Sequence, residues 1–209
     1  VSKVKPLERV EAVLAEGHRV FGENYVQEAA AKWPGLRERF GPVELHMIGP
    51  LQTNKAKTAV ELFDAIHTLD RPSLAEKLAR LAEARGTCPQ LFVQVNTGEE
   101  PQKGGVLPAG VDGFVAECRS LGLVLRGPPA AGTAKVEFTA EEEKAVGPQL
   151  EVQGRAAALG AELEAMAERN GRAGLSMGMS GDFETAIALG ATHVRIGSAI
   201  FGARAYGAR

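Results

Sequence analysis

The sequence is poor in cysteine and has no excess of either charge. Its 209 residues include two cysteines, Cys88 and Cys118, without metal-ligand spacing or the density of a secreted disulfide scaffold. We therefore interpret both as reduced, buried thiols of a cytoplasmic protein. The net charge of -2 supplies no basic face, so nothing favours nucleic acid or an anionic membrane as a partner.

Long apolar runs are also absent. No stretch approaches the roughly 18 residues that a membrane-spanning helix needs, and the start shows no signal-peptide pattern. No Pro/Ser-rich linker divides the chain, so we expect a single domain over residues 1–209. The sequence also lacks a His-Asp-Ser order, which argues against a hydrolase triad. It lacks an HExxH motif and cysteine clusters, which argues against a metal site.

Short β-branched runs alternate with helical stretches along the whole chain. The predicted strands are residues 1–4, 18–22, 43–49, 64–68, 91–96, 123–126, 174–178 and 193–196. Between them apolar residues recur three and four positions apart, as Leu74, Leu78 and Leu81 do. Eight strand-helix units favour a (β/α)8 TIM-type barrel, with an open parallel sheet as the alternative.

Polar residues and glycines gather where the predicted strands end, which is the face on which such barrels build their sites. The last two strand ends carry Gly178, Ser180, Gly197, Ser198 and Gly202. Their backbone N–H groups and hydroxyls could bind a phosphate, or the glycines could simply make tight turns. His46 and His67 end strands and could line the site, whereas we expect His18 and His193 at the opposite face.

Two cations stand in or beside apolar strands. Lys3, directed into the barrel mouth, would attack an aldehyde once burial favours its neutral amine. Lys5 has the same orientation and is the second candidate. Arg195 lies inside an apolar strand and needs a ligand or a carboxylate. The alternatives are a solvated Lys3 near the chain start and a core ion pair for Arg195.

With these residues in view, the sequence resembles the pyridoxal 5'-phosphate (PLP) homeostasis proteins, single-domain relatives of the alanine racemase N-terminal barrel. The resemblance covers most of the chain. Its motifs are residues 1–3 (VSK), 21–25 (FGENY), 46–55 (HMIGPLQTNK), 67–70 (HTLD), 95–96 (VN), 103–105 (KGG), 176–180 (SMGMS) and 194–202 (VRIGSAIFG). Residues 128–159 depart from the family pattern, and Pro128-Pro129 should end the sixth strand early because proline lacks the ladder donor.

The resemblance implies a fold type III PLP barrel with the cofactor held covalently, as a Schiff base on Lys3. The cofactor-binding residues that it implies are Lys3, Asn24, Ser176, Met177, Arg195, Gly197 and Ser198. Among them, Ser176, Gly197 and Ser198 would hold the phosphate, and Asn24 would line the ring pocket. No catalytic residue and no metal are implied.

Arg195 would face the pyridine nitrogen in this family. A guanidinium stays protonated, so the pyridine nitrogen would stay unprotonated and the cofactor would be a poorer electron sink. The chain given ends at Arg209, after the eighth strand and its helix, so we expect no second domain with a catalytic base. The resemblance therefore implies buffering and delivery of PLP to PLP-dependent apoenzymes, by a monomer or weak dimer in the cytoplasm.

Other functions remain open at this point. The chain could be an active fold type III PLP enzyme, such as an amino-acid racemase, with Tyr25 or His67 as its base. It could be a cofactor-free aldolase that uses Lys3 with a phosphorylated substrate. It could also be a regulatory module that binds a partner protein.

Overall fold

The computed structural model of the protein describes residues 1–3, 5–97, 99–123, 133–136, 165–166, 168–170 and 174–202. These residues form seven strands in one sheet: β1 (Val20–Glu23), β2 (Glu44–Met47), β3 (Ala65–Leu69), β4 (Gln90–Val95), β5 (Thr133–Val136), β6 (Gly174–Met179) and β7 (His193–Arg195). Every strand pairs in parallel with the next one along the chain. A doubly wound sheet reverses its strand order at a switch point, so this sequential order is that of the predicted TIM-type barrel.

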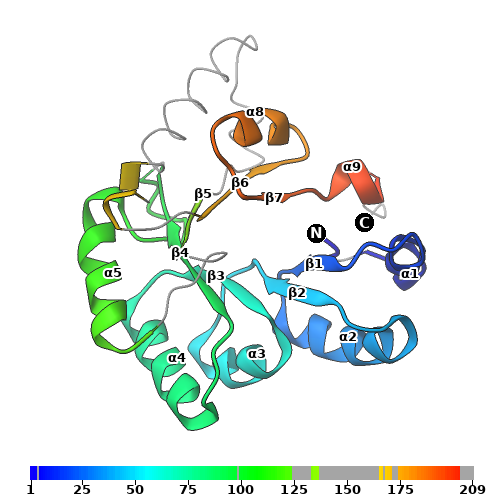
Figure 1. Ribbon diagram of the computed structural model, residues 1–209, viewed down its shortest axis with the longest axis horizontal. Coiled ribbons are helices and arrows are strands. Elements are labelled where there is room, and N and C mark those ends of the chain that lie inside the picture. Colours follow the sequence, from blue (N-terminus) through cyan, green and yellow to red (C-terminus); the bar gives the residue numbers. More distant parts are fainter. Residues whose placement is uncertain are drawn as a thin grey trace.

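Helices lie outside the ring of strands, as Figure 1 shows. They are α1 (Leu7–Ala15), α2 (Val26–Phe40), η1 (Thr53–Lys55), α3 (Ala56–Leu62), α4 (Pro72–Arg85), η2 (Pro108–Gly110), α5 (Val111–Ser120), α8 (Phe183–Ala188) and α9 (Ser198–Phe201). Local sequence explains the ends of α4, because Pro72 stands in its first turn and Gly86 follows it with a left-handed φ of 73°.

The chain start closes the ring between β7 and β1 (Figure 1). The backbone nitrogen of Val1 donates to Ile196 O at 2.7 Å, and the N–H of Ser2 donates to Gly22 O at 2.9 Å. The segment thus bonds to both neighbours, although its described residues do not form the regular strand predicted for residues 1–4. One hydrogen bond to each side is too few for a ladder.

The sixth predicted strand also differs. Leu123 lies outside any strand, directly after the turn at Gly122, and residues 124–126 lie outside the described residues. The place between β4 and β6 is taken by Thr133–Val136 instead, paired from Phe92↔Thr133 to Lys135↔Ser176. This segment has the N–H donors that the Pro128-Pro129 pair lacks, and its Thr and Val are β-branched, as strands favour.

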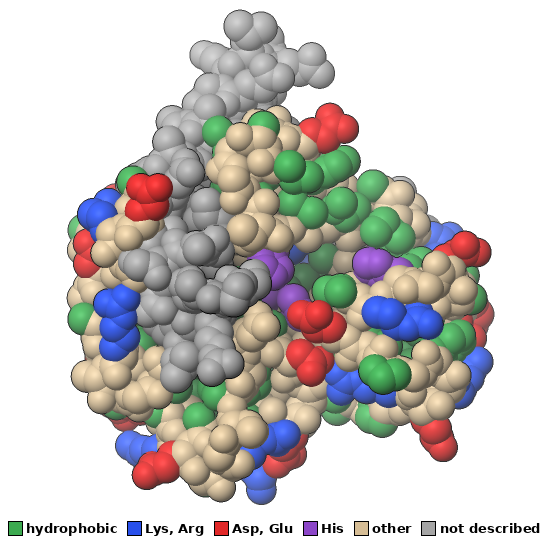
Figure 2. All heavy atoms as spheres, in the orientation of Figure 1, with side chains coloured by type: hydrophobic (Ala, Val, Ile, Leu, Met, Phe, Trp, Pro, Cys, Tyr) green, Lys and Arg blue, Asp and Glu red, His purple; other side chains and the backbone are tan. Residues whose placement is uncertain are grey.

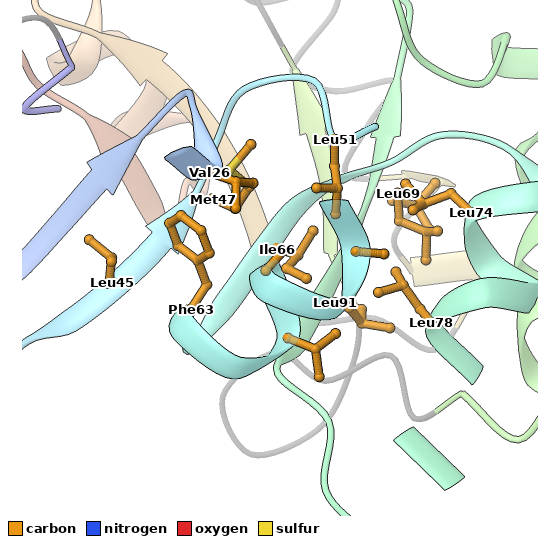
Figure 3. Packing of buried hydrophobic residues seen from close by; sticks show 14 of the residues in the cluster. Val26, Leu45, Met47, Leu51, Phe63, Ile66, Leu69, Leu74, Leu78 and Leu91 are labelled. Carbon is orange, nitrogen blue, oxygen red and sulfur yellow. The ribbon is translucent and has the colours of Figure 1, made fainter. Parts of the chain in front are cut away.

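The hydrophobic core lies between the strands and the helices around them. In Figure 3, Leu69 of β3 lies beside Leu74 of α4, and Leu91 of β4 lies beside Leu78 of the same helix. These four side chains are fully buried, and each contributes roughly 1.5–3 kcal/mol of burial free energy. Leu81, on the same predicted helix face, packs partly buried against this cluster. The packed layer holds the strand ends that carry the site.

Candidate functional site

Alternate side chains of the strands point outward to the helices and inward to the barrel. On β2, Leu45 and Met47 belong to the hydrophobic core, whereas His46 between them lines an interior cavity. On β4, the inward Phe92 stacks on His67 of β3, with ring centroids 3.9 Å apart. On these two strands the side chains toward the helices are therefore apolar, and those toward the interior include an imidazole and an aromatic ring.

The interior cavity has a volume of about 220 Å³ and lies between β1 and β7. Its polar lining is His18, His46, His67, Ser176, His193 and Arg195. Figure 2 shows histidine side chains around a hollow at the centre of this face. His193 begins β7 and the exposed His18 precedes β1, so both lie at the amino-terminal end of their strands as predicted, and the cavity extends to both.

A chain of polar contacts crosses the barrel interior. His46 Nε2 lies 2.8 Å from Glu44 Oε1, and His46 Nδ1 lies 3.0 Å from His67 Nε2. The other nitrogen of His67, Nδ1, lies 3.1 Å from Ser176 Oγ. His46, His67 and Ser176 are buried, whereas 47% of the Glu44 side chain is exposed. Four side chains from β2, β3 and β6 thus connect the solvent with the centre of the barrel.

His193 on β7 faces this chain of contacts without an equivalent bond to it. Its ring centroid lies 6.2 Å from that of His46 and 6.1 Å from that of His67. Burial lowers the pKa of His193 below its ordinary value, a positive charge on His46 lowers it further, and Glu44 raises it. His193 is therefore a neutral ring at neutral pH.

Two irregularities in strand pairing lie next to the cavity. The register between β3 and β4 shifts between Ile66 and Leu69, and that between β6 and β7 shifts between Ser176 and Met179. Bulges of this kind re-aim side chains at the edges of sites. Gly178 lies within the second one with a φ of 92°, and a Cβ there would lie 2.5 Å from Ala186 Cβ. Only glycine fits that position.

A buried carboxylate anchors the chain start to α2. Oε1 of Glu23 accepts hydrogen bonds from Ser2 Oγ at 2.7 Å and from Trp33 Nε1 at 3.0 Å. Lys32 Nζ lies 2.6 Å from the same oxygen, and the Glu23 side chain is fully buried. Three donors from two segments therefore converge on one atom, which fixes Ser2 on the outer side of the ring beside Lys3.

The neighbours of Val1 show what the chain start brings together. Val1 lines the interior cavity together with Arg195, and its backbone nitrogen donates to Ile196 O. A Cβ on Gly197 would lie 3.5 Å from Val1 Cβ. Lys3, which is half-buried, thus lies in the same neighbourhood as Arg195 and the start of α9.

The start of α9 presents converging donors. The N–H groups of Gly197 and Ala199 donate to Ser180 Oγ at 3.1 and 3.3 Å. At the other end of α9, Lys5 Nζ donates to Gly202 O at 2.7 Å. This second candidate lysine is therefore engaged in holding α9.

Asn24 and Gly49 meet at the ends of β1 and β2. A Cβ on Gly49 would lie 2.3 Å from Asn24 O, so only glycine permits this approach. The amide oxygen Oδ1 of Asn24 and the hydroxyl of Thr68 are both buried without a hydrogen-bond partner among the described residues. Buried polar atoms normally have partners, so these two oxygens are available to a bound molecule.

The structure separates the predicted site residues into groups. Ser176 and Arg195 line the cavity together with Val1, Gly197 lies against Val1, and Lys3 follows Val1 by two positions. Met177 is buried in the hydrophobic core, on the other side of β6 from Ser176. Ser198 is exposed at the first turn of α9, and Asn24 presents its buried amide oxygen next to Gly49.

Two carboxylates of the site were missed by sequence reasoning. Glu44 precedes His46 by two positions, and this period places both side chains on the same face of a strand. Glu23 stands inside the predicted strand-end motif, but its bonds to Ser2 and Trp33 join residues that no local pattern pairs. The alternation of side chains along a strand could have identified Glu44, whereas no local pattern could have identified Glu23.

A second groove, of about 1100 Å³, lies along α4 and the chain that precedes β4. It is at the amino-terminal end of the strand, away from the strand ends that carry barrel sites. Cys88 lines it, and burial raises the pKa of this thiol to about 11, so the nucleophilic thiolate is scarce. Within the described ranges no group of side chains could hold a metal ion, and no helix there could cross a membrane.

Comparison with known proteins gives consistent relatives. The family model described as alanine racemase, N-terminal domain, matches residues 4–205. The pyridoxal phosphate homeostasis protein of Vibrio alginolyticus is 38% identical over 209 residues, which cover 99% of this chain and 85% of that protein. The protein of the same name from Escherichia coli K12 is 38% identical over 208 residues, with the same coverage.

Solved structures agree with this result. PipY of Synechococcus elongatus PCC7942 with PLP bound has a TM-score of 0.78 and 33% identity, covering 96% of this chain and 90% of that chain. The same protein without PLP has a TM-score of 0.76 and 36% identity, with the same coverage. An alanine racemase from Clostridium difficile 630 has a TM-score of 0.66, covers 97% of this chain and 51% of that one, and at 14% identity indicates a common fold alone.

Proposed function

This chain belongs to the alanine racemase N-terminal domain family and, within it, to the pyridoxal phosphate homeostasis proteins, and from that membership we propose that it binds PLP. The observation that carries the proposal is that Val1, two residues before Lys3, lines the interior cavity together with Arg195 and lies against Gly197. A lysine, an arginine and a glycine-rich helix start at the strand ends of a barrel suit an anionic aldehyde cofactor.

Lys3 would hold the cofactor as a Schiff base. Ser2 is bound on the outer side of the ring through Glu23, so the adjacent Lys3 is offered to the opposite, inner side. Lys5 is engaged with the carbonyl of Gly202 and is the weaker candidate. Bound PLP supplies an aldehyde that reacts with amines and a pyridine ring that can accept electrons.

The phosphate would bind where the last two strands end. The N–H groups of Gly197 and Ala199 already point at one oxygen, that of Ser180, which is the arrangement that a phosphate oxygen would meet. The unpartnered oxygens of Asn24 and Thr68 are acceptors, and they suit donors elsewhere on the cofactor. We propose the other predicted contacts, Ser198 and the backbone of Met177, at the same end.

Arg195 supports a binding role over racemisation. Its guanidinium lines the cavity, and a permanently charged group opposite the pyridine nitrogen keeps that nitrogen unprotonated, which weakens the ring as an electron sink. A racemase also needs a base on the far side of the ring. Tyr25 is 56% exposed, and His67 is engaged with His46 and Ser176, so neither is placed as such a base.

We therefore propose that the protein buffers PLP and delivers it to PLP-dependent apoenzymes, with no dedicated reaction of its own. We further propose that residues 1–209 act as one domain, as a monomer or weak dimer in the cytoplasm. Relatives named for PLP homeostasis and the PLP-bound structure of PipY support the cofactor assignment.

The absorbance spectrum of the purified protein, before and after borohydride reduction, tests the proposal. We expect a yellow Schiff-base band, and after reduction a PLP mass on the peptide that contains Lys3. Lys3→Ala should lose the trapped adduct, whereas Lys77→Ala, an exposed lysine on α4, should retain it. A colourless protein that gains no mass with PLP would refute the assignment and favour a cofactor-free lysine chemistry. Turnover of alanine or serine would instead favour the racemase.

A further inference from the structure

We propose that Glu44, His46, His67 and Ser176 form a proton relay that couples binding of an anionic group at Ser176 to the uptake of one proton. The coupling depends on the proposed function in one respect, that the bound cofactor brings an anionic oxygen of its phosphate or ring to Ser176. The relay itself depends only on three contacts, at 2.8, 3.0 and 3.1 Å. His67 is thus a positioning residue that acts through Ser176.

Glu44, at the exposed end of the relay, determines which atom donates and which accepts in each of its hydrogen bonds. An ionised carboxylate only accepts, so His46 Nε2 must carry the hydrogen that points to Glu44. A neutral imidazole has one N–H, which leaves His46 Nδ1 as an acceptor for the N–H at His67 Nε2. His67 Nδ1 is then also an acceptor, and the Ser176 hydroxyl must donate to it. In this neutral relay Ser176 can only accept hydrogen bonds from a ligand.

One added proton reverses the His46–His67 and His67–Ser176 bonds without moving a heavy atom. When the added proton reaches Nδ1 of His46, that ring becomes a cation with both nitrogens protonated, still paired with Glu44. Nε2 of His67 then accepts, its proton is carried on Nδ1, and this N–H donates to Ser176 Oγ. The Ser176 hydroxyl hydrogen is released and can be donated to a ligand. The added charge lies on His46, next to a carboxylate.

This reversal links the ligand to the proton. An anionic oxygen at Ser176 needs a donor, so it binds better to the protonated relay and draws one proton into it. The proton enters at Ser176 Oγ, because His46 Nε2 already carries a hydrogen toward Glu44. Ser176 passes its own hydrogen to His67 Nδ1, and His67 passes its Nε2 hydrogen to His46 Nδ1. Affinity for an anionic ligand should therefore rise as pH falls, by at most about tenfold per pH unit for one linked proton.

Several other charged or titratable groups face the relay and shift its protonation equilibrium. Among the described residues, the other titratable or charged side chains on the cavity wall are His18, His193 and Arg195. Arg195 opposes a positive relay, whereas Glu44 favours it. On β4 the neighbour is the uncharged ring of Phe92, stacked on His67 with the planes 9° apart. That stacking keeps the His67 ring oriented while its proton moves.

Histidine tautomers measured by NMR in the cofactor-free protein test the relay without any ligand. At pH 7.5 we expect His46 and His67 both protonated at Nε2 only. On acidification, His46 should become doubly protonated while His67 shifts its proton to Nδ1. A His67 that carries its proton at Nδ1 at pH 7.5 would overturn the relay direction. A Glu44→Gln variant should lose the tautomer preference, because an amide can both donate and accept.

Calorimetry with pyridoxine 5'-phosphate tests the coupling to binding. This probe has the phosphate and ring but no aldehyde, so Schiff-base formation at Lys3 contributes no protons. Titrations at pH 7.5 in buffers of different ionisation enthalpy give the number of protons taken up. We expect wild-type protein to take up close to one proton more than Glu44→Gln. The matched control Glu61→Gln, an exposed carboxylate on α3, should behave as wild type.

The possible failures are distinct. Equal proton uptake in wild type and Glu44→Gln, with the probe bound by both, overturns the coupling and leaves PLP binding standing. No binding of the probe, together with no Schiff base on Lys3, overturns the proposed function and with it the coupling, whatever the tautomers show.

Discussion

Removing the carboxylate of Glu23 should destabilise the protein strongly. Glu23→Ala leaves the Lys32 ammonium, which is only 10% exposed, without its 2.6 Å partner and leaves Ser2 and Trp33 without their acceptor. Breaking a buried ion pair on one side costs about 3–5 kcal/mol of unfolding free energy. At roughly 2–4 °C per kcal/mol for a chain of this size, the midpoint of thermal unfolding should fall by at least about 6 °C.

The same substitution should loosen the chain start and with it the cofactor lysine. Urea unfolding measures the stability, and trapping of PLP by borohydride measures the occupancy of Lys3 in the folded protein. Glu28→Ala is the matched control, because this residue contacts the same Lys32 at 3.5 Å but is 31% exposed, and such pairs contribute at most about 1 kcal/mol. Equal effects of the two substitutions, or a loss below about 1 kcal/mol for Glu23→Ala, would refute the anchoring role.

Three further predictions concern other parts of the structure. Gly49→Ala should cost about 1–3 kcal/mol of stability, measured by urea unfolding, because its Cβ would lie 2.3 Å from Asn24 O. Acidification below about pH 6.5 should lower stability through His193, whose pKa is lowered by folding, so the unfolded chain binds its proton first. Cys88, with its pKa raised to about 11, should react far more slowly at pH 8 with a thiol reagent than free cysteine does.

Each of the three has its own control. Gly35 of α2 has open space around its missing Cβ, so Gly35→Ala should leave stability equal or higher, and a similar loss at both glycines would contradict the steric explanation. His193→Gln should flatten the stability profile between pH 6.5 and the lower folded pKa. An unchanged slope would assign the effect to another group. Fast modification of Cys88 in the folded protein would contradict its burial.

Much of the barrel could be predicted from local pattern. Six predicted strands overlap β1, β2, β3, β4, β6 and β7, because a strand that packs against helices carries its own apolar period. The two failures lie where local pattern is weakest. Residues 1–3 make one backbone hydrogen bond to each side within the described part of the chain. The sixth position in the sheet is taken by Thr133–Val136, which pairs with the neighbouring strands β4 and β6.

The site divides in the same way. Glycines such as Gly49 and Gly197 mark strand ends in the sequence, because a close backbone approach requires a residue without a side chain. The sequence gives no sign of the relay, because His67 and Ser176 are 109 residues apart and meet only through the register of the closed sheet. Likewise, no local pattern indicates that the cavity extends to His193 at the beginning of β7.

The sequence by itself thus determined the class of fold, the family and the lysine to consider, because those depend on periodicity and on short motifs. Tertiary structure decided which polar groups share a proton and which acid anchors the chain start. It also decided which side of β6 faces the cavity, with Ser176 inward and Met177 in the core. Such pairings depend on strand register and ring closure, and these are properties of the whole barrel that no single segment carries.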